Sequence, residues 1–309
     1  MQTAYIYHPD CLKHDMGMGH PECPQRLITI ENELLTTGLL SQLQCYDAPL
    51  ATMDQLVRVH TPGYIESIRQ AAPTAGLIAL DADTAMNPFT LNAALRAAGS
   101  AVLATNLVLA ETVNNAFCAI RPPGHHAESD RAMGFCLFNN VAVGVAHAIE
   151  HHHLQRVAIL DFDVHHGNGS EEIFHDNPHV MLCSTFQHPF YPYSGANSGS
   201  DRMINAPLRR DADGAVFRQA VKDSWLPALN RFKPEMIFVS AGFDAHRDDD
   251  MSQVYLSDDD YVWITQQIVS IADQYSQGRV VSVLEGGYEL HSLARCVAAH
   301  IRVLQGKEI

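Results

Sequence analysis

The stretch VAILDFDVHHGNG, residues 157–169, places an unbroken apolar run directly before a cluster of carboxylates, histidines and glycines. Short runs rich in Val, Ile and Leu are typical of a strand that is buried on both faces, as in a parallel sheet. Because side chains alternate between the faces of a strand, we expect Asp161, Asp163 and His165 on one face. Two carboxylates and an imidazole that converge favour a bound cation, since the carboxylates would otherwise repel one another. The structural alternative is an Asp/His cluster that caps the following helix.

Similar apolar runs recur along the chain and alternate with helical patterns. Strands are predicted at 4–8, 116–121, 157–164, 180–186, 236–243 and 280–287. Helices are predicted at 24–37, 62–71, 91–111, 139–152, 213–232, 257–275 and 290–305. Asn139 and the pair Ser257 and Asp260 provide capping signals at two of the helix starts. This alternation predicts an α/β fold with a parallel sheet covered by helices on both faces. Without an internal repeat or a linker, residues 1–309 are interpreted as one domain.

The composition excludes several classes of protein. Lys and Arg number 20 against 35 Asp and Glu, and the net charge of −15 disfavours binding to nucleic acid or to an anionic membrane. The 7 cysteines, an odd number at irregular spacing, do not form the pattern of a disulfide framework. No apolar run approaches the roughly 20 residues of a membrane span, and the N-terminus reads as a strand and not as a signal peptide. We therefore expect a cytoplasmic protein.

Four polar, glycine-containing segments follow four of the predicted strands. They are RPPGHH (121–126), DFDVHHG (161–167), GFDAHRDD (242–249) and EGGY (285–288). In open α/β sheets, ligands bind at the carboxyl ends of the strands. Four such segments at strand ends therefore predict an active site.

The residue types in these segments indicate metal-assisted proton transfer. Asp244 is placed to complete a set with Asp163 and His165, and three protein ligands leave coordination positions open, as in catalytic zinc sites. Mixed carboxylate and imidazole ligation favours zinc but also suits Fe(II). His246 is a spare ligand candidate, although a loop histidine is the simpler interpretation.

The histidine pair of RPPGHH can then supply the acid and the base. A neutral imidazole can take a proton from water and return one to the leaving group. Asp161, the carboxylate not used for metal, can hold one ring of the pair and fix its tautomer. In EGGY, Gly286 and Gly287 permit close approach of the backbone, and the Tyr288 hydroxyl can donate to a developing oxyanion.

Five motifs follow one another along the chain, in the order RPPGHH, GFCLFNN (134–140), DFDVHHGNG, GFDAHRDD and EGGY. In this order and spacing they resemble the zinc-dependent histone deacetylase family. That family includes bacterial histone deacetylase-like amidohydrolases and acetylpolyamine amidohydrolases, and the resemblance is closest to its class II members. It covers nearly the whole chain, from GHPECPQR at 19–26 to the last predicted strand. The resemblance implies the arginase–deacetylase fold with an eight-stranded parallel sheet. It also implies metal-dependent hydrolysis of N-acetyl amines.

The resemblance implies a role for each matching residue. The zinc ligands would be Asp163, His165 and Asp244. His126 would be the general base and general acid, His125 backed by Asp161 its electrostatic partner, and Tyr288 the group that polarises the acetyl carbonyl. The walls, floor and rim of an acyl-lysine tunnel would be Phe135, Tyr191, Gly134 and Asp83. A structural potassium site would use Asp161, Asp163, His165, Ser184 and Thr185, and a second potassium site Phe174 and Val180.

Three positions depart from the family pattern. Asn168 stands where many members have an aspartate behind the second active-site histidine, which is the class II pattern and should not abolish activity. Tyr191 replaces a common phenylalanine and makes the tunnel wall more polar. Met251 occupies a position where a polyamine-selective member would carry an acid, which weakens a polyamine interpretation.

The N-terminal segment 11–23 has the residue types of a structural zinc knuckle, in Cys11, His14, His20 and Cys23. The more ordinary interpretation is favoured, because GHPECPQR resembles a family loop whose His20 and Glu22 border the active-site entrance.

The leading hypothesis is a zinc amidohydrolase that removes acetyl groups from lysine side chains of peptides or proteins, or from small amines. A manganese ureohydrolase of the same fold is a second hypothesis, but His166-Gly167-Asn168 lacks the further aspartate that a second metal needs. A silent acyl-lysine binding module is a third, and it would not need the complete set of ligands and proton-transfer residues.

Overall fold

The computed structural model describes residues 1–307, whose strands form one eight-stranded sheet and one short hairpin. The sheet strands are β1 (Thr3–Tyr7), β2 (Gln44–Asp47), β5 (Asn115–Cys118), β6 (Val157–Asp161), β7 (Val180–Gln187), β8 (Met203–Leu208), β9 (Met236–Ala241) and β10 (Val280–Leu284). Their order is β2-β1-β5-β10-β9-β6-β7-β8, and every neighbouring pair is parallel. The hairpin pairs β3 (Ile78–Ala79) with β4 (Ala85–Met86).

All six predicted strands are present, but the two edge strands of the sheet were not predicted. In β2, half-buried and exposed positions alternate over only four residues, so the strand has no apolar run that could be recognised. The other edge strand, β8, contains Pro207, which lacks the N–H of a ladder bond and is tolerated at a sheet edge. Edge strands need less apolar character, so their sequence signal is weaker.

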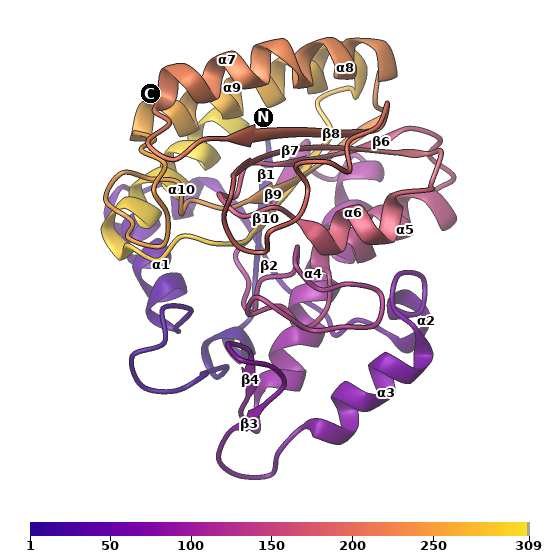
Figure 1. Cartoon of the computed structure of the whole chain (residues 1–309), viewed down its shortest axis with the longest axis vertical. Coiled ribbons are helices and arrows are strands. Elements are labelled where there is room, and N and C mark those ends of the chain that lie inside the picture. The colour runs from indigo at the N-terminus through magenta and orange to yellow at the C-terminus, as the bar shows by residue number, and fades with distance from the viewer. Residues whose placement is uncertain (308–309) are drawn as a thin grey trace.

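Helices cover both faces of the sheet, as predicted (Figure 1). One face carries α1 (Gln25–Thr36), α7 (Gly214–Asp223), α8 (Trp225–Phe232), α9 (Asp258–Tyr275) and α10 (Leu290–Leu304). The other face carries α4 (Thr90–Leu109), α5 (Asn140–Glu150) and α6 (Asn168–Phe174). The remaining helical segments are the short turns η1 (Pro9–Leu12) and η2 (Leu40–Gln42), with α2 (Met53–Leu56) and α3 (Pro62–Ala71).

Local signals set several of these helix boundaries. The Asn139 side chain accepts from the Ala142 N–H at the start of α5, and Ser257 and Asp260 form a capping box at the start of α9, as predicted. The single helix predicted at 213–232 is wrong, because the chain breaks at Ser224 into α7 and α8. Pro227 follows within the first turn of α8, where a missing N–H is tolerated, so the helix restarts there.

The strand order brings the four predicted segments together. β5, β10, β9 and β6 are consecutive in the sheet, and these are the strands after which RPPGHH, EGGY, GFDAHRDD and DFDVHHG begin. Leu284 pairs with Ala241 and Asp161 with Ser240, so these strands end at nearly the same level. The carboxyl ends of the four central strands therefore converge at one edge of the sheet.

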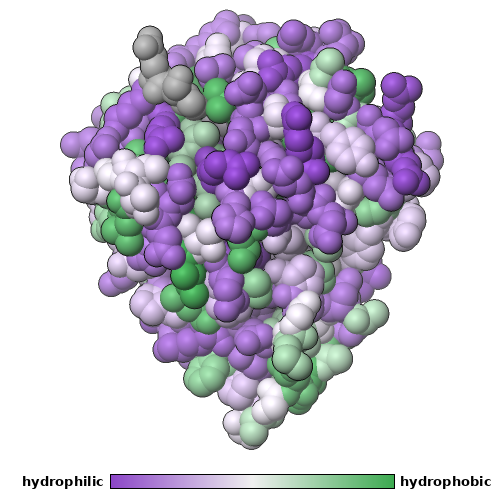
Figure 2. All heavy atoms as spheres, turned by 90° about the vertical axis from the view of Figure 1, so that its left-hand side faces the viewer, coloured by the Kyte–Doolittle hydropathy of each residue, from purple (hydrophilic) through white to green (hydrophobic). Residues whose placement is uncertain are grey.

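The outer surface agrees with the acidic composition. The face in Figure 2 is mostly hydrophilic, with small separate hydrophobic areas. Within residues 1–307, no helix is both long enough and apolar enough to cross a membrane.

His300 of α10 leads to a prediction about stability. Its ring is fully buried, with Thr265 Oγ1 2.8 Å from Nδ1 and Ser282 Oγ 2.8 Å from Nε2. Burial lowers the pKa of His300 to about 3, so below about pH 6.5 the unfolded chain binds a proton that the folded chain does not. The stabilising contribution of the neutral ring is therefore complete above pH 6.5 and is lost as pH falls towards 3.

Urea denaturation at pH 7.0 and 5.5 tests this prediction. We expect the free energy of unfolding of the wild type to fall by about 1 kcal/mol more than that of His300→Gln over this interval. The matched control is His291→Gln, which removes an exposed histidine near the start of α10. An equal pH dependence of the wild type and His300→Gln would contradict the prediction.

Candidate active site

A cavity of about 150 Å³ lies at the carboxyl ends of the central strands. Its lining residues are Asp83, Pro123, His125, His126, Gly134, Phe135, His165, Phe190, Tyr191, Met251, Gly286 and Tyr288. The four predicted residues of the tunnel and Met251 are among them. The structure therefore places the predicted wall residues and the predicted proton-transfer residues around one space.

Asp163 and Asp244 converge on His165, which lines this cavity. Each offers one ligand atom, and these atoms lie within 4.8 Å of one another. His165 Nδ1 is 3.0 Å from Asp163 Oδ1 and 3.2 Å from Asp244 Oδ2. One ring nitrogen thus faces two carboxylates, and all three side chains are buried.

The chemistry of this cluster fits a divalent metal ion. Burial and the nearby Asp163 carboxylate raise the pKa of Asp244 to about 6. Burial lowers the pKa of His165, but the nearby carboxylates of Asp163 and Asp244 outweigh it and raise that pKa to about 10. The two carboxylates therefore require positive charge, and Asp244 Oδ2 is a buried oxygen without a hydrogen-bond partner. A cation among the three atoms satisfies both conditions.

Gly286 makes room beside the same cluster. A Cβ at this position would lie 2.0 Å from Asp244 Oδ2 and 2.6 Å from Asp163 Oδ2. The Gly286 N–H donates to Asp163 Oδ2 at 2.8 Å, which fixes that carboxylate. The close backbone approach predicted for EGGY is thus directed at the carboxylates.

The convergence does not arise from strand alternation, and that part of the prediction is wrong. β6 ends at Asp161, so Asp163 and His165 lie on the following loop. There the Asp161 side chain accepts from the Asp163 N–H at 3.1 Å, and the Asp163 side chain accepts from the His165 N–H at 2.9 Å. These side-chain-to-backbone bonds shape the loop and direct the two side chains.

The two histidines of RPPGHH have different partners. His125 Nδ1 is 3.0 Å from Asp161 Oδ2, and its Nε2 is 3.8 Å from Asp163 Oδ1. Burial lowers the pKa of His125, but Asp163 and Asp161 outweigh it and raise that pKa well above its usual value. His125 is therefore positively charged at neutral pH.

His126 has no carboxylate behind it. Its Nδ1 is 2.8 Å from Asn168 Oδ1. Burial, together with the charges of His125 and His165, lowers the pKa of His126 well below its usual value. His126 is therefore neutral at neutral pH and lines the cavity with a free ring edge. Because the pKa values of the two adjacent rings shift in opposite directions, His125 is suited to an electrostatic role and His126 to that of a base.

Tyr288 is positioned by charges beneath the cavity. The Arg26 guanidinium lies 4.9 Å from the centre of the Tyr288 ring, and Arg26 also donates to Gly287 O at 2.6 Å. Asp249 Oδ2 accepts from the Tyr288 N–H at 2.6 Å. Burial raises the pKa of the Tyr288 phenol well above its usual value, so the hydroxyl keeps its proton and can donate it.

Phe135 and Tyr191 both form part of the cavity wall. The ring of Tyr191 meets that of His126 edge-on at 5.3 Å between centres, and Phe135 meets Tyr288 at 6.0 Å. Gly134 has a φ of 56°, and a Cβ there would lie 2.5 Å from the His126 ring. Only glycine leaves space for His126 at this turn.

Comparison with known proteins agrees with this geometry. Residues 20–304 match the histone deacetylase domain family. The chain belongs to the histone deacetylase family. The histone deacetylase-like amidohydrolase of Pseudomonas aeruginosa is 36% identical over 99% of this chain and 86% of its own length. The polyamine deacetylase HDAC10 of Mus musculus is 36% identical over 99% of this chain and 48% of its own length.

Histone deacetylase structures share the fold. The crystal structure of the HDA15 HD domain superposes with a TM-score of 0.92 at 33% sequence identity, over 99% of this chain and 88% of that one. The predicted arginase–deacetylase architecture, one α/β domain with an eight-stranded parallel sheet, is therefore confirmed.

Several residues around this candidate site were not predicted. Phe190 and Pro123 line the cavity, and the Phe190 ring stacks on His165 at 5.6 Å. Glu285 accepts from the Gly124 and His125 N–H groups at 2.7 and 3.1 Å, which ties EGGY to the histidine turn. Burial raises the pKa of Glu285 to about 7. A carboxylate next to the glycines of EGGY was the available signal for Glu285, whereas nothing local distinguishes Phe190.

Of the two residues of the N-terminal segment that were expected at the entrance, only His20 lies there. His20 does reach the tunnel, where its ring meets Phe135 at 4.7 Å. The placement of Glu22 at the entrance is wrong, because Glu22 is fully buried between Arg26 and Arg121. Both arginines need a buried counter-charge. Burial raises the pKa of Glu22, but Arg121 and His14 outweigh it and hold that pKa well below its usual value. Among the described residues, the convergent ligand groups do not include Cys11, His14, His20 or Cys23, and His14 Nδ1 faces Thr90 Oγ1 at 2.8 Å.

Removal of any one ligand should weaken metal binding. We expect Asp163→Ala, His165→Ala and Asp244→Ala each to lower affinity for a divalent metal by about 100-fold or more, because each removes one of three protein ligands. Metal content after dialysis against a weak chelator, measured by inductively coupled plasma mass spectrometry, checks this. Asp248→Ala, an exposed carboxylate on the same loop as Asp244, is the control. A variant that retains stoichiometric metal would show that its residue is not a ligand.

Proposed function

We propose that the protein is a zinc-dependent amidohydrolase that removes acetyl or longer acyl groups from lysine side chains of peptides or proteins, or from small N-acylated amines. One observation carries the proposal: a buried group of three side chains that could bind a metal lies beside a cavity lined by a neutral histidine and a protonated tyrosine. Membership of the histone deacetylase family supports it.

Asp163, His165 and Asp244 would hold the ion. Three protein ligands with open positions favour zinc, and the same donor set also accepts Fe(II). A bound divalent ion supplies Lewis acidity to the amide carbonyl and makes water more acidic.

The protein groups then move the protons. His126 accepts a proton from the attacking water and later donates it to the leaving amine. His125, charged and held by Asp161, stabilises the negative charge that develops beside it. The Tyr288 hydroxyl donates a hydrogen bond to the former carbonyl oxygen, where a fixed donor stabilises the transition state more than the ground state.

The cavity walls indicate the shape of the substrate. Phe135 and Tyr191 would flank an extended aliphatic chain, and Asp83, whose carboxylate lies near the cavity, would accept hydrogen bonds from the substrate backbone. A small acetylated polyamine is the alternative substrate, because two of the relatives are named polyamine deacetylase. Met251 lines the cavity without offering a charge to a second amine, which favours acyl-lysine.

Two other hypotheses have less support. A ureohydrolase would need a second metal, and in the part of the chain that the structure describes only three ligand atoms converge here. A silent acyl-lysine binding module would not require the His125–Asp161 and His126–Asn168 contacts that orient the two rings.

A structural potassium ion is part of the proposal. Asp161 pairs with Ser184 across β6 and β7, and Ser184 Oγ is buried without a hydrogen-bond partner. An oxygen of this kind suits a monovalent cation held with Thr185, Asp163 and His165. The second suggested site, at Phe174 and Val180, stays a prediction.

A substrate panel tests the proposed function. For the zinc-loaded protein we expect kcat/KM for an acetyl-lysine peptide to exceed that for N-acetylputrescine by about tenfold or more, because Met251 forgoes an ion pair worth about 1.4 kcal/mol. Longer acyl-lysine peptides in the same panel define the acyl preference. A reversed ratio would favour the polyamine alternative, and no turnover of any amide would contradict the proposal.

The two tandem histidines should not be equivalent. We expect His126→Ala to lower kcat by about 10²-fold or more, and Tyr288→Phe by about 10²-fold, because each removes a group that acts in the transition state. His125→Ala should cost less, since its role is electrostatic. The measurement is kcat at equal zinc occupancy, and a much larger loss for His125→Ala than for His126→Ala would reverse the assigned roles.

A further inference from the structure

Asn168 creates a problem of orientation for His126. A carboxylate behind a histidine can only accept, so it always draws the ring proton to the facing nitrogen. A side-chain amide has an accepting oxygen and a donating nitrogen, and it can present either one. If Asn168 Nδ2 faced His126, the proton would move to Nε2, the ring nitrogen left for the substrate side. His126 could then no longer accept a proton there.

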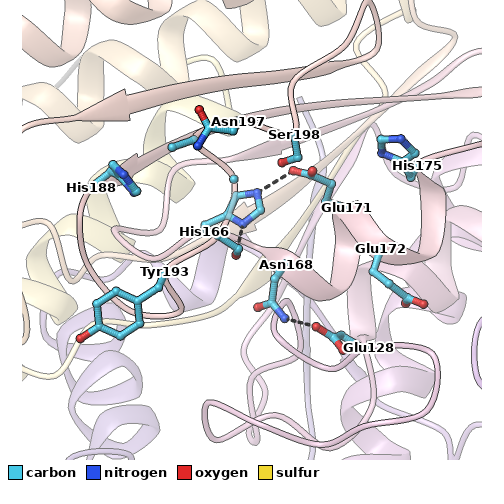
Figure 3. Close-up of a pocket in the computed structure, with 13 residues that line it drawn as sticks. Glu128, His166, Asn168, Glu171, Glu172, His175, His188, Tyr193, Asn197 and Ser198 are labelled. Carbon is cyan, nitrogen blue, oxygen red and sulfur yellow. Dashed lines mark hydrogen bonds and ion pairs between the residues drawn. The ribbon is translucent and has the colours of Figure 1, made fainter.

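Glu128 removes this ambiguity. Its Oε1 lies 2.7 Å from Asn168 Nδ2 (Figure 3), whereas the other end of the amide, Asn168 Oδ1, lies 2.8 Å from His126 Nδ1. An ionised carboxylate has no proton to donate, so the amide nitrogen must face Glu128 and the amide oxygen must face His126. The other contacts of Asn168 Nδ2 are longer, 3.4 Å to His126 O and 3.3 Å to Met133 Sδ.

We propose that Glu128 is a positioning residue that selects the active tautomer of His126 by fixing the orientation of the Asn168 amide. The inference rests on the proposed role of His126 as general base. The chain of contacts runs from Glu128 Oε1 through Asn168 to His126 Nδ1, with distances of 2.7 and 2.8 Å. It leaves His126 Nε2 unprotonated and directed to the cavity.

The surroundings of Glu128 hold its side chain and backbone in place. Arg131 Nη2 donates to the same Oε1 atom at 2.8 Å. The Glu128 backbone is also fixed, because its N–H donates to Arg131 O at 3.0 Å and its carbonyl oxygen faces His60 Nδ1 at 2.9 Å. Glu128 lines a groove of about 620 Å³ that is separate from the cavity of the proposed reaction. It therefore acts on His126 without touching the substrate.

A double-mutant cycle tests this proposal. We expect Glu128→Met to lower kcat for an acetyl-lysine peptide by about tenfold or more with KM changed less than about twofold, since the base and not substrate binding is affected. In the Asn168→Asp background, the same substitution should change kcat by less than about threefold, because a carboxylate needs no partner to choose its orientation. Glu128→Gln should retain most of the activity, because the Arg131 donor would hold the amide oxygen of Gln where it can still accept from Asn168.

The matched control is Glu172→Met. Glu172 lines the same groove but accepts from the Ser129 N–H and hydroxyl at 2.9 and 2.8 Å, without contact to Asn168. We expect it to leave kcat within about twofold of the wild type. An effect equal to that of Glu128→Met would show that any lost carboxylate in the groove matters, and would overturn the proposal.

A second readout does not depend on turnover. Two-bond ¹H–¹⁵N correlation spectra of zinc-loaded protein labelled in its histidine rings show which ring nitrogen carries the proton, and the His126 signal is identified by its loss in His126→Gln. We expect the proton on Nδ1 in the wild type and in Glu172→Met, and a shift towards Nε2 in Glu128→Met.

The two readouts separate failure of this inference from failure of the proposed function. A His126 proton that stays on Nδ1 in Glu128→Met, or an equal loss of kcat with and without Asn168→Asp, would overturn the inference while amide hydrolysis stands. A tautomer shift in a protein that hydrolyses no amide would support the inference about His126 and contradict the proposed reaction.

Discussion

The buried contact of Asp163 and Asp244 with one nitrogen of His165 is the constraint around which this end of the molecule is arranged. Two carboxylates removed from water repel one another unless positive charge lies between them. The surroundings hold both acids in position: a glycine N–H fixes Asp163, and the Val164 N–H donates to Asp244 at 2.9 Å. A fold that holds two buried carboxylates this close together favours the binding of a cation between them.

The same negative charge separates the behaviour of the two histidines in RPPGHH. His125 lies next to Asp161 and Asp163 and is held in the charged form, whereas His126 next to it is kept neutral by burial and by that positive neighbour. The two identical side chains thus have opposite protonation states, although their ring centres are only 4.0 Å apart. The carboxylates of Asp161 and Asp163 keep His125 charged, and the charge of His125 in turn lowers the pKa of His126.

A second cluster of buried charged side chains stabilises the turns around the first cluster. Glu22 bridges Arg26 and Arg121, and the two arginines also donate to backbone carbonyls, Arg26 to Gly287 and Arg121 to Cys11 and His14. These bonds attach the N-terminal segment to the RPPGHH and EGGY turns. Removing one member would leave an unpaired buried charge, which is far more costly than the net value of the pairs. The N-terminal segment therefore belongs to the framework of the site.

The sequence by itself determined the six apolar strands, most helices, and the residue types at the strand ends, because burial on both faces of a parallel sheet requires continuous apolar runs and glycine-rich turns follow them. It did not determine β2 and β8, whose edge positions need little apolar surface, or the break before Pro227. Only the tertiary structure decided that β5, β10, β9 and β6 are neighbours, that Glu22 is buried, and that Glu128 orients Asn168. Those outcomes depend on contacts between residues such as Glu128 and Asn168, far apart in the chain, and no local pattern encodes which distant partner satisfies a buried polar atom.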